Sequence, residues 1–205
     1  IRYETMDPAK EEGFSVLAEH LKNSNSESII YYLATPPLLY GVIPQHLKTF
    51  RLNGENTRII VEKPFGYDLT SAKQLNEIYR DTFQEQQVYR IDHFLGKETA
   101  QNILAFRFAN SIFEPIWNRN YIDYVEITSV ENLGIENRGG YYETAGTMRD
   151  MVQNHLVQLL ALCAMEPPVK FDADSFRNEV VKVYDSLVPL TEDYIRENVI
   201  RGQYT

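Results

Sequence analysis

The chain has 205 residues, of which 43% are hydrophobic, 24% charged and 12% aromatic, and its formal net charge at pH 7 is −9. This composition is typical of a globular protein with a hydrophobic core. Nucleic acids and anionic membranes bind basic surfaces, so the acidic balance argues against both as partners. A small anionic ligand needs only a few local cations and stays compatible with it.

The cysteine content and the two ends of the sequence indicate the cellular compartment of the protein and whether the chain is a fragment. The single cysteine, Cys163, excludes a disulfide within the chain and suits a reducing compartment. The sequence has no run of 18 apolar residues and no signal peptide, so we expect a cytoplasmic protein. The chain begins with Ile and ends at RGQYT, which suggests a fragment of a longer protein.

The first half of the chain alternates between helical and strand patterns. Apolar residues at helical spacing predict helices over 8–22, 36–50, 68–84 and 95–110. Continuous apolar, β-branched and aromatic runs predict buried strands over 28–35, 57–66 and 87–92. Thr70 or Ser71 is the predicted N-cap of the third helix. Strands and helices that alternate with short connections predict βαβ units on a parallel sheet.

After about residue 110 the pattern changes. The segment YIDYVEITSVEN (121–132) alternates polar and apolar residues, as in an antiparallel strand with one face in water. RGGYYETAG (138–146) predicts a glycine-rich turn, and helices are predicted over 148–165 and 176–187. The sequence therefore predicts the last part of a doubly wound α/β domain joined to the start of an α+β domain.

Polar residues follow each of the three predicted strands, which end in ATPP, EKPFG and RIDH. Ligands of open parallel sheets bind at the carboxyl ends of the strands. We therefore expect Lys63, Asp92 and His93 to cluster, although a solvated group at any one strand end would be unremarkable. His93 and Lys97 also flank the start of the next helix, where free N–H groups and added cations favour a phosphate. The alternative for Lys97 is an exposed first-turn residue beside Glu98.

One histidine, His155, falls in the apolar stripe of the helix predicted over 148–165. A buried imidazole needs hydrogen-bond partners, and a core histidine satisfied by a backbone carbonyl is the simpler interpretation. A general base oriented by a carboxylate is the functional one. Asp150 nearby and Asp92 far away are both candidate partners, and spacing alone does not choose between them. For Glu131, at the end of the predicted strand, a solvated loop position is the simpler interpretation.

Several motifs resemble the glucose-6-phosphate dehydrogenase family: RIDHFLGKE, EKPFG, RFANSIFEPIWNRNYI, RGGYYETAGTMRDMVQNH, AMEPP and RGQYT. They occur in order across nearly the whole chain, and the pairing of RIDHFLGKE with RDMVQNH is highly specific. The resemblance implies oxidation of glucose 6-phosphate to 6-phosphogluconolactone, the first step of the pentose phosphate pathway. The hydride acceptor is NADP, with NAD used by some members, and no metal is expected. Full-length members form homodimers or homotetramers.

The resemblance also implies domains and roles. Residues 1–94 would be a partial dinucleotide-binding (Rossmann-like) domain and residues 95–205 a partial α+β substrate and dimerisation domain. The general base falls on His155 and its carboxylate partner on Asp92. The implied substrate-binding residues are His93, Phe94, Lys97, Glu131, Asp150 and Lys63. The implied cofactor-binding residues are Lys63, Thr35, Pro36 and Tyr40. The peptide bond between Lys63 and Pro64 is cis in the family.

Two departures from the family accompany these matches. Phe94 stands where the family usually has Tyr, which predicts a weaker hold on phosphate with the stacking of the ring intact. No glycine-rich dinucleotide fingerprint precedes residue 28, and the family's C-terminal portion is absent, so we expect this piece to be inactive alone. The alternatives are another Rossmann-type sugar oxidoreductase and a non-catalytic phosphosugar-binding module. The presence of both His155 and Asp92 argues against the module.

Overall fold

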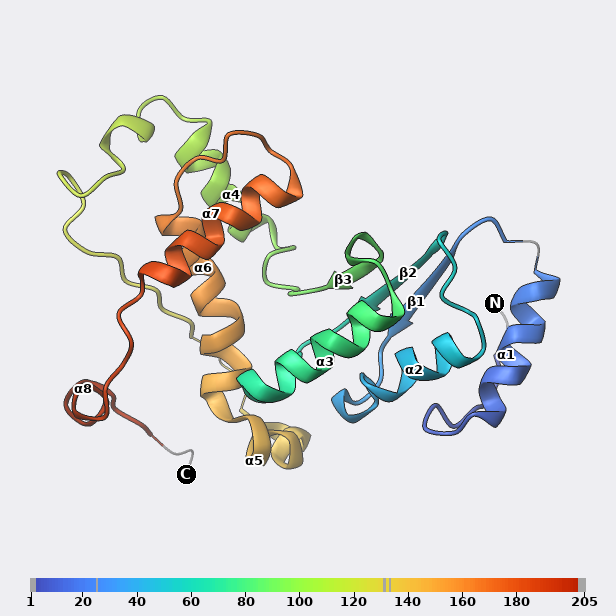
Figure 1. The fold of residues 1–205 in the computed structure, drawn as a ribbon. Helices are drawn as coiled ribbons and strands as arrows, with labels where there is room; N and C mark the ends of the chain where they lie inside the picture. Colours follow the sequence, from blue (N-terminus) through green and yellow to red (C-terminus); the bar gives the residue numbers. More distant parts are fainter. Residues whose placement is uncertain (1–2, 25, 131, 133, 203–205) are drawn as a thin grey trace. The chain divides into compact units, whose positions relative to one another are not determined.

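The computed structural model describes residues 3–24, 26–130, 132 and 134–202 (Figure 1). The chain divides into two compact units, Ile1–Asp92 and His93–Thr205. None of the helices in the described residues is long and apolar enough to cross a membrane.

The first unit is a three-stranded parallel sheet covered by helices, as the alternating pattern predicts. Its strands are β1 (Ile29–Leu33), β2 (Thr57–Val61) and β3 (Val88–Arg90), in the order β1-β2-β3. Its helices are α1 (Glu12–Asn23), α2 (Val42–Thr49) and α3 (Leu69–Thr82), with 3-10 turns η1 (Pro37–Leu39) and η2 (Glu85–Gln87). Helices α2 and α3 pack side by side against the sheet (Figure 1).

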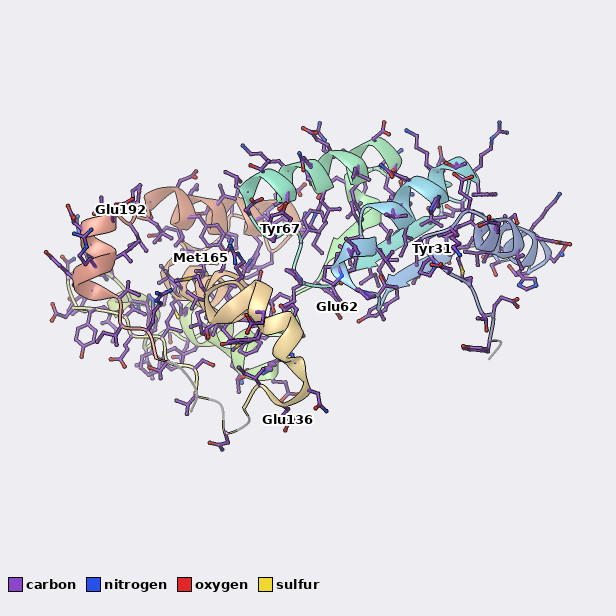
Figure 2. The ribbon with its side chains drawn as sticks, turned by 90° about the horizontal axis from the view of Figure 1, so that it is seen from below. Tyr31, Glu62, Tyr67, Glu136, Met165 and Glu192 are labelled. Carbon is purple, nitrogen blue, oxygen red and sulfur yellow. The ribbon has the colours of Figure 1, made fainter. Side chains whose placement is uncertain are left out.

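The core of this unit lies under the sheet face that carries Leu33, Ile59, Val61 and Val88. Tyr79 of α3 is fully buried there, and burial raises the pKa of its hydroxyl. At the amino ends of the strands the buried Gln87 donates its amide to the carbonyls of Gly54 and Thr57, at 2.8 and 3.0 Å. Tyr31 of β1 donates its hydroxyl to the Leu52 carbonyl at 3.0 Å (Figure 2). These bonds tie the loops to the sheet.

The connection from β2 to α3 explains the EKPFG motif. The Lys63–Pro64 bond is cis, which confirms what the family resemblance implied. Gly66 has φ +83°, and an added Cβ would lie 2.6 Å from the Ala72 nitrogen, so only glycine fits. Asp68 caps α3 by accepting the Ser71 N–H at 2.7 Å, and Ser71 accepts the Asp68 N–H in return. The prediction of Thr70 or Ser71 as N-cap was wrong, because Asp68 is the extended residue before the helix.

Within the described residues of the second unit, the regular secondary structure is helical, and irregular segments connect the helices. It contains α4 (Glu98–Phe108), α5 (Gly139–Thr147), the π-helix η5 (Met148–Leu156), α6 (Val157–Ala164), α7 (Ala173–Ser186) and α8 (Glu192–Asn198). Two 3-10 turns are η3 (Glu114–Ile116) and η4 (Glu136–Arg138). Helices α4, α6 and α7 enclose a core around Leu162, Met165 and Val180; Met165 is labelled in Figure 2.

Two predictions for this unit were wrong. Residues 138–146 do not form a turn but mostly α5, and only Gly146 departs from helical geometry, at φ +61°. The strand predicted over 121–132 does not form in its described part, 121–130, where Tyr124 is 76% and Val130 81% exposed. A strand needs neighbours that pair with its backbone N–H and C=O groups, and the described residues of this unit include no other strand.

A buried arginine fastens the end of α6. Arg107 of α4 is 5% exposed and donates to the carbonyls of Leu162 and Met165, at 2.7 and 2.8 Å. Trp117 adds a bond from its indole N–H to the Cys163 carbonyl at 2.8 Å. The final carbonyls of a helix lack partners within the helix, and a cation there is favoured by the helix dipole. Burial lowers the pKa of Arg107 and raises that of the Cys163 thiol.

Replacing Arg107 by Met would leave two buried carbonyls without their donors. We expect the free energy of unfolding of the full-length protein to fall by about 3 kcal/mol, measured by urea denaturation. Arg177→Met is the matched control, because the Arg177 side chain is 64% exposed, and its cost should stay below about 0.5 kcal/mol. Equal effects of the two substitutions would contradict the anchoring role of Arg107.

Candidate functional site

The three strands of the first unit end level with one another. Leu33, Val61 and Arg90 are paired in register and are the last residues of their strands. Thr35, Lys63 and Asp92 each follow two positions later, so all three lie at the carboxyl edge of the sheet. This is the edge at which parallel sheets bind ligands. The structure therefore brings the predicted Lys63 and Asp92 to one edge, together with Thr35.

The residues after β1 differ in their access to a ligand. Pro36 is exposed, and the buried Oγ1 of Thr35 has no hydrogen-bond partner among the described residues. The side chain of Tyr40 is 2% exposed within the core, and burial raises the pKa of its hydroxyl. Pro36 is therefore open to solvent, whereas the Thr35 hydroxyl and the Tyr40 side chain are enclosed by the protein.

The second unit begins with a short turn that carries three predicted substrate residues. The backbone N–H of Gly96 donates to the His93 carbonyl, and that of Lys97 to the Phe94 carbonyl, at 3.3 and 3.1 Å. Helix α4 starts at Glu98, with Lys97 as its N-cap residue and no side-chain cap. His93 and Lys97 are exposed and Phe94 is half-buried. An imidazole and an ammonium thus stand at the start of α4, beside the positive end of the helix dipole, which is the end that attracts anions such as phosphate.

His155 has no exposed surface and lies against this turn. Its imidazole stacks on the Phe94 ring, with centroids 4.0 Å apart and planes 15° apart. The His93 ring meets the same imidazole edge to face at 4.8 Å. The structure therefore places the predicted base beside His93, a predicted phosphate-site residue, and Phe94, a predicted substrate-binding residue.

The helix that carries His155 is a π-helix over its first nine residues, Met148–Leu156. At its end the N–H of Val157 bonds to the carbonyl of Val152, five residues back. Residues five apart therefore lie nearly above one another, which places Asp150 and His155 on the same side of the helix. Both side chains are buried, at 4% and 0% exposure. Such π-helical turns are rare in proteins, and those that occur are often found at functional sites.

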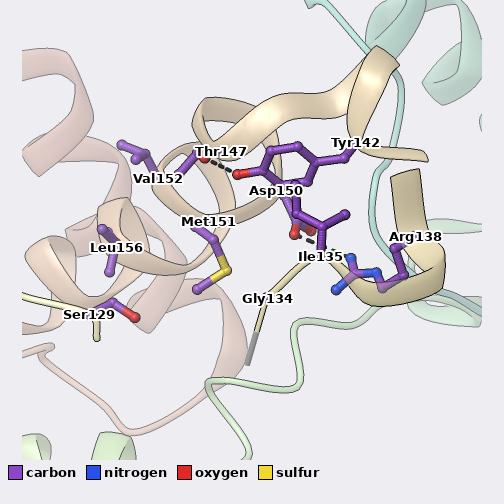
Figure 3. Close-up of a pocket in the computed structure, with 10 residues that line it drawn as sticks. All are labelled: Ser129, Gly134, Ile135, Arg138, Tyr142, Thr147, Asp150, Met151, Val152 and Leu156. Atoms are coloured by element: carbon purple, nitrogen blue, oxygen red, sulfur yellow. Dashed lines mark hydrogen bonds and ion pairs between the residues drawn. The ribbon is translucent and has the colours of Figure 1, made fainter. Parts of the chain in front are cut away.

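Asp150 lines a pocket of about 170 Å³ together with Ser129, residues 134–138 and side chains of α5 and η5 (Figure 3). Its carboxylate accepts hydrogen bonds from Arg138 at 3.2 Å and from the Tyr141 hydroxyl at 3.1 Å. The hydroxyls of Tyr142 and Thr147, on the pocket wall, are hydrogen-bonded to each other. The pocket thus offers hydroxyl, guanidinium and carboxylate groups to a polar ligand.

Several of these contacts could not be foreseen. The stacking of Phe94 on His155 joins residues that are far apart in the sequence. Arg138 and Tyr141, which pair with Asp150, lie in a segment that had been predicted as a turn. Glu131, predicted to bind sugar hydroxyls, lies outside the described residues. The burial of Arg107 could have been predicted, since this cation stands between Phe106 and Phe108 in a predicted helix.

Two family models match the chain. Residues 1–102 match the NAD binding domain of glucose-6-phosphate dehydrogenase, which places the chain among proteins that bind a nicotinamide dinucleotide. Residues 104–205 match the C-terminal domain of glucose-6-phosphate dehydrogenase. The chain belongs to the glucose-6-phosphate dehydrogenase family.

Individual relatives agree with this assignment. Glucose-6-phosphate 1-dehydrogenase of Aggregatibacter actinomycetemcomitans is 57% identical over 178 residues, covering 85% of this chain and 36% of the relative. That of Treponema pallidum is 49% identical over 212 residues, covering 100% of this chain and 41% of the relative.

Solved structures show the same relationship. The X-ray crystal structure of glucose-6-phosphate 1-dehydrogenase from Mycobacterium avium has a TM-score of 0.88 at 41% identity, over 99% of this chain and 43% of that one. A glucose-6-phosphate dehydrogenase in complex with its substrate glucose-6-phosphate has a TM-score of 0.79 at 34% identity, over 97% and 46%. The chain therefore spans less than half the length of these relatives.

Replacing Tyr141 by Phe would remove the hydroxyl that donates to Asp150 and keep the ring. A hydrogen bond to a charged group contributes about 1.5–3 kcal/mol, so amides of α5 and η5 should exchange about 10- to 100-fold faster. Hydrogen–deuterium exchange of the full-length protein measures this. Tyr124→Phe is the control, because Tyr124 is 76% exposed and should leave the rates unchanged. Unchanged exchange in Tyr141→Phe would show that this bond does not hold α5 to η5.

Proposed function

We propose that the protein that carries this chain oxidises glucose 6-phosphate to 6-phosphogluconolactone and transfers the hydride to NADP or NAD. The observation that carries this proposal is the fully buried imidazole of His155 beside the turn that presents His93 and Lys97. A buried base next to a histidine and a lysine that can bind an anion suits a substrate that has both a reacting hydroxyl and a phosphate. The relative in complex with glucose-6-phosphate supports this substrate.

In the proposed reaction His155 accepts the proton of the C1 hydroxyl as the hydride leaves C1. Asp92 is its proposed carboxylate partner, which would fix the tautomer and stabilise the imidazolium that forms. Support for this pair comes from position: Asp92 directly precedes His93, whose ring centroid is 4.8 Å from that of His155. His93 and Lys97 would hold the phosphate, with Phe94 stacking beside them.

The sugar hydroxyls need placed hydrogen-bond partners. Asp150 is the proposed acceptor on the His155 side of η5, and Glu131 is a further proposed one. Lys63, at the sheet edge with Thr35 and Pro36, would lie between the sugar and the nicotinamide. Tyr40 would act from the core, behind Thr35 and Pro36.

The finer domain arrangement is part of the same proposal. Residues 1–94 would belong to the dinucleotide-binding domain, and residues 95–205 to an α+β substrate and dimerisation domain. The exposed apolar side chains along 121–130 support a segment that other parts of the full-length protein cover. A homodimer or homotetramer in the cytoplasm is the proposed form.

The proposal is tested by assaying the full-length protein with glucose 6-phosphate and, separately, with free glucose, each with NADP and with NAD. We expect reduced cofactor to form with glucose 6-phosphate at a far higher kcat/KM than with glucose, because the phosphate supplies binding energy. Turnover of free glucose but not of glucose 6-phosphate would contradict the proposal and favour another sugar oxidoreductase.

Substitution of Lys97 by Ala would remove the ammonium, one of the two side chains proposed to hold the phosphate. We expect KM for glucose 6-phosphate to rise about 10- to 100-fold, the worth of a charged hydrogen bond, with a smaller effect on kcat. Lys170→Ala is the matched control, since Lys170 is an exposed lysine of the same unit outside the site. An unchanged KM in Lys97→Ala would remove Lys97 from the phosphate site.

A further inference from the structure

The ring of Phe94 has a group against each of its faces. The His155 imidazole is nearly parallel to it at 4.0 Å between centroids, and the Lys97 ammonium lies 3.8 Å from the Phe94 centroid. Both groups cannot occupy one face at these distances without overlapping, so they lie on opposite faces. The Phe94 stack, defined as Lys97, Phe94 and His155, is thus a continuous column.

His93 closes one side of this column. Its ring meets Phe94 at 5.1 Å and His155 at 4.8 Å, both edge to face. Edge-to-face and parallel contacts are the preferred arrangements of aromatic rings.

An imidazole that accepts a proton must point one nitrogen at the substrate. A hydrogen bond to one nitrogen directs that atom but leaves the ring free to tilt about it, since the second side-chain torsion of histidine has a broad energy minimum. A parallel ring at 4.0 Å restricts this tilt. The same ring attracts an ammonium to its other face by a cation–π interaction.

We propose that Phe94 is a positioning residue, whose ring fixes the plane of the His155 imidazole and the place of the Lys97 ammonium together. One side chain then sets the distance between the base and the phosphate-binding cation. This inference rests on the proposed function, because it assigns Phe94 to the same reaction. It requires an aromatic face and no hydroxyl, so it accommodates the replacement of the family's tyrosine.

The test compares Phe94→Leu and Phe94→Tyr in the full-length protein. Leucine fills space without a flat face, so kcat should fall about 100-fold, the cost of a misplaced reacting group, and KM for glucose 6-phosphate should rise as Lys97 loses its support. Tyrosine keeps the face, and kcat should stay close to that of the wild type. Phe176→Leu is the matched control, because Phe176 packs in the core of the same unit away from the stack, and its kcat should not change.

A spectroscopic measurement separates this inference from the proposed function. In the protein labelled with [13C]histidine, stacking should shift the ring protons of His155 upfield, and Phe94→Leu should abolish the shift while Phe94→Tyr retains it. Loss of the shift together with loss of kcat supports the proposal. Wild-type kcat in Phe94→Leu, or an unchanged shift, overturns it. A wild-type protein that ignores glucose 6-phosphate but shows the Phe94-dependent shift would refute the proposed function and leave the ring positioning established.

Discussion

The imidazole of His155 has lost all contact with solvent, and burying such a group is favourable only where protein atoms replace the interactions that water made. In the second unit, Phe94 covers one face of the ring and His93 meets it edge to face. The turn over residues 93–97 and the helix η5 are therefore held together at His155. The arrangement of the proposed sugar-phosphate site depends on this single buried ring.

The helix that carries His155 is secured beyond both of its ends. At the far end of α6, Arg107 and Trp117 bond three carbonyls that the helix itself leaves without partners. On the other side, Arg138 and Tyr141 hold the buried carboxylate of Asp150. Between them the π-helical spacing turns Asp150 and His155 to one side. A fixed helix with its polar groups aligned is the preorganisation that catalysis by a buried base requires.

The sequence allowed the parallel sheet to be predicted, because its strands are continuous apolar runs and its helices have clear spacing. The level strand ends follow from that topology, which is why Lys63 and Asp92 could be assigned to one edge. The N-cap was misplaced because both Asp68 and Ser71 take part in the capping box, and composition alone does not rank them. The strand expected over 121–132 failed for another reason: alternation describes two faces but does not supply a pairing strand.

The contacts of the site itself were harder to predict. Nothing in the pattern of residues 148–165 distinguishes a π-helix from an α-helix, since the two helices have similar numbers of residues per turn and would bury the same apolar side chains. Phe94 was expected to bind substrate and to keep the stacking of its ring, but its contact with His155 was not foreseen, because it joins residues sixty-one positions apart. Tertiary contacts of this kind are fixed by packing and not by local preference.

In the proposed reaction, His155 accepts the proton during hydride transfer. The most direct measurement is the single-turnover rate of cofactor reduction in His155→Asn of the full-length protein, with glucose 6-phosphate affinity measured by calorimetry on the same sample. Loss of a general base should slow hydride transfer by about 10²- to 10⁴-fold while the affinity for the sugar phosphate stays close to that of the wild type. A wild-type rate in His155→Asn would contradict the account and place the base elsewhere.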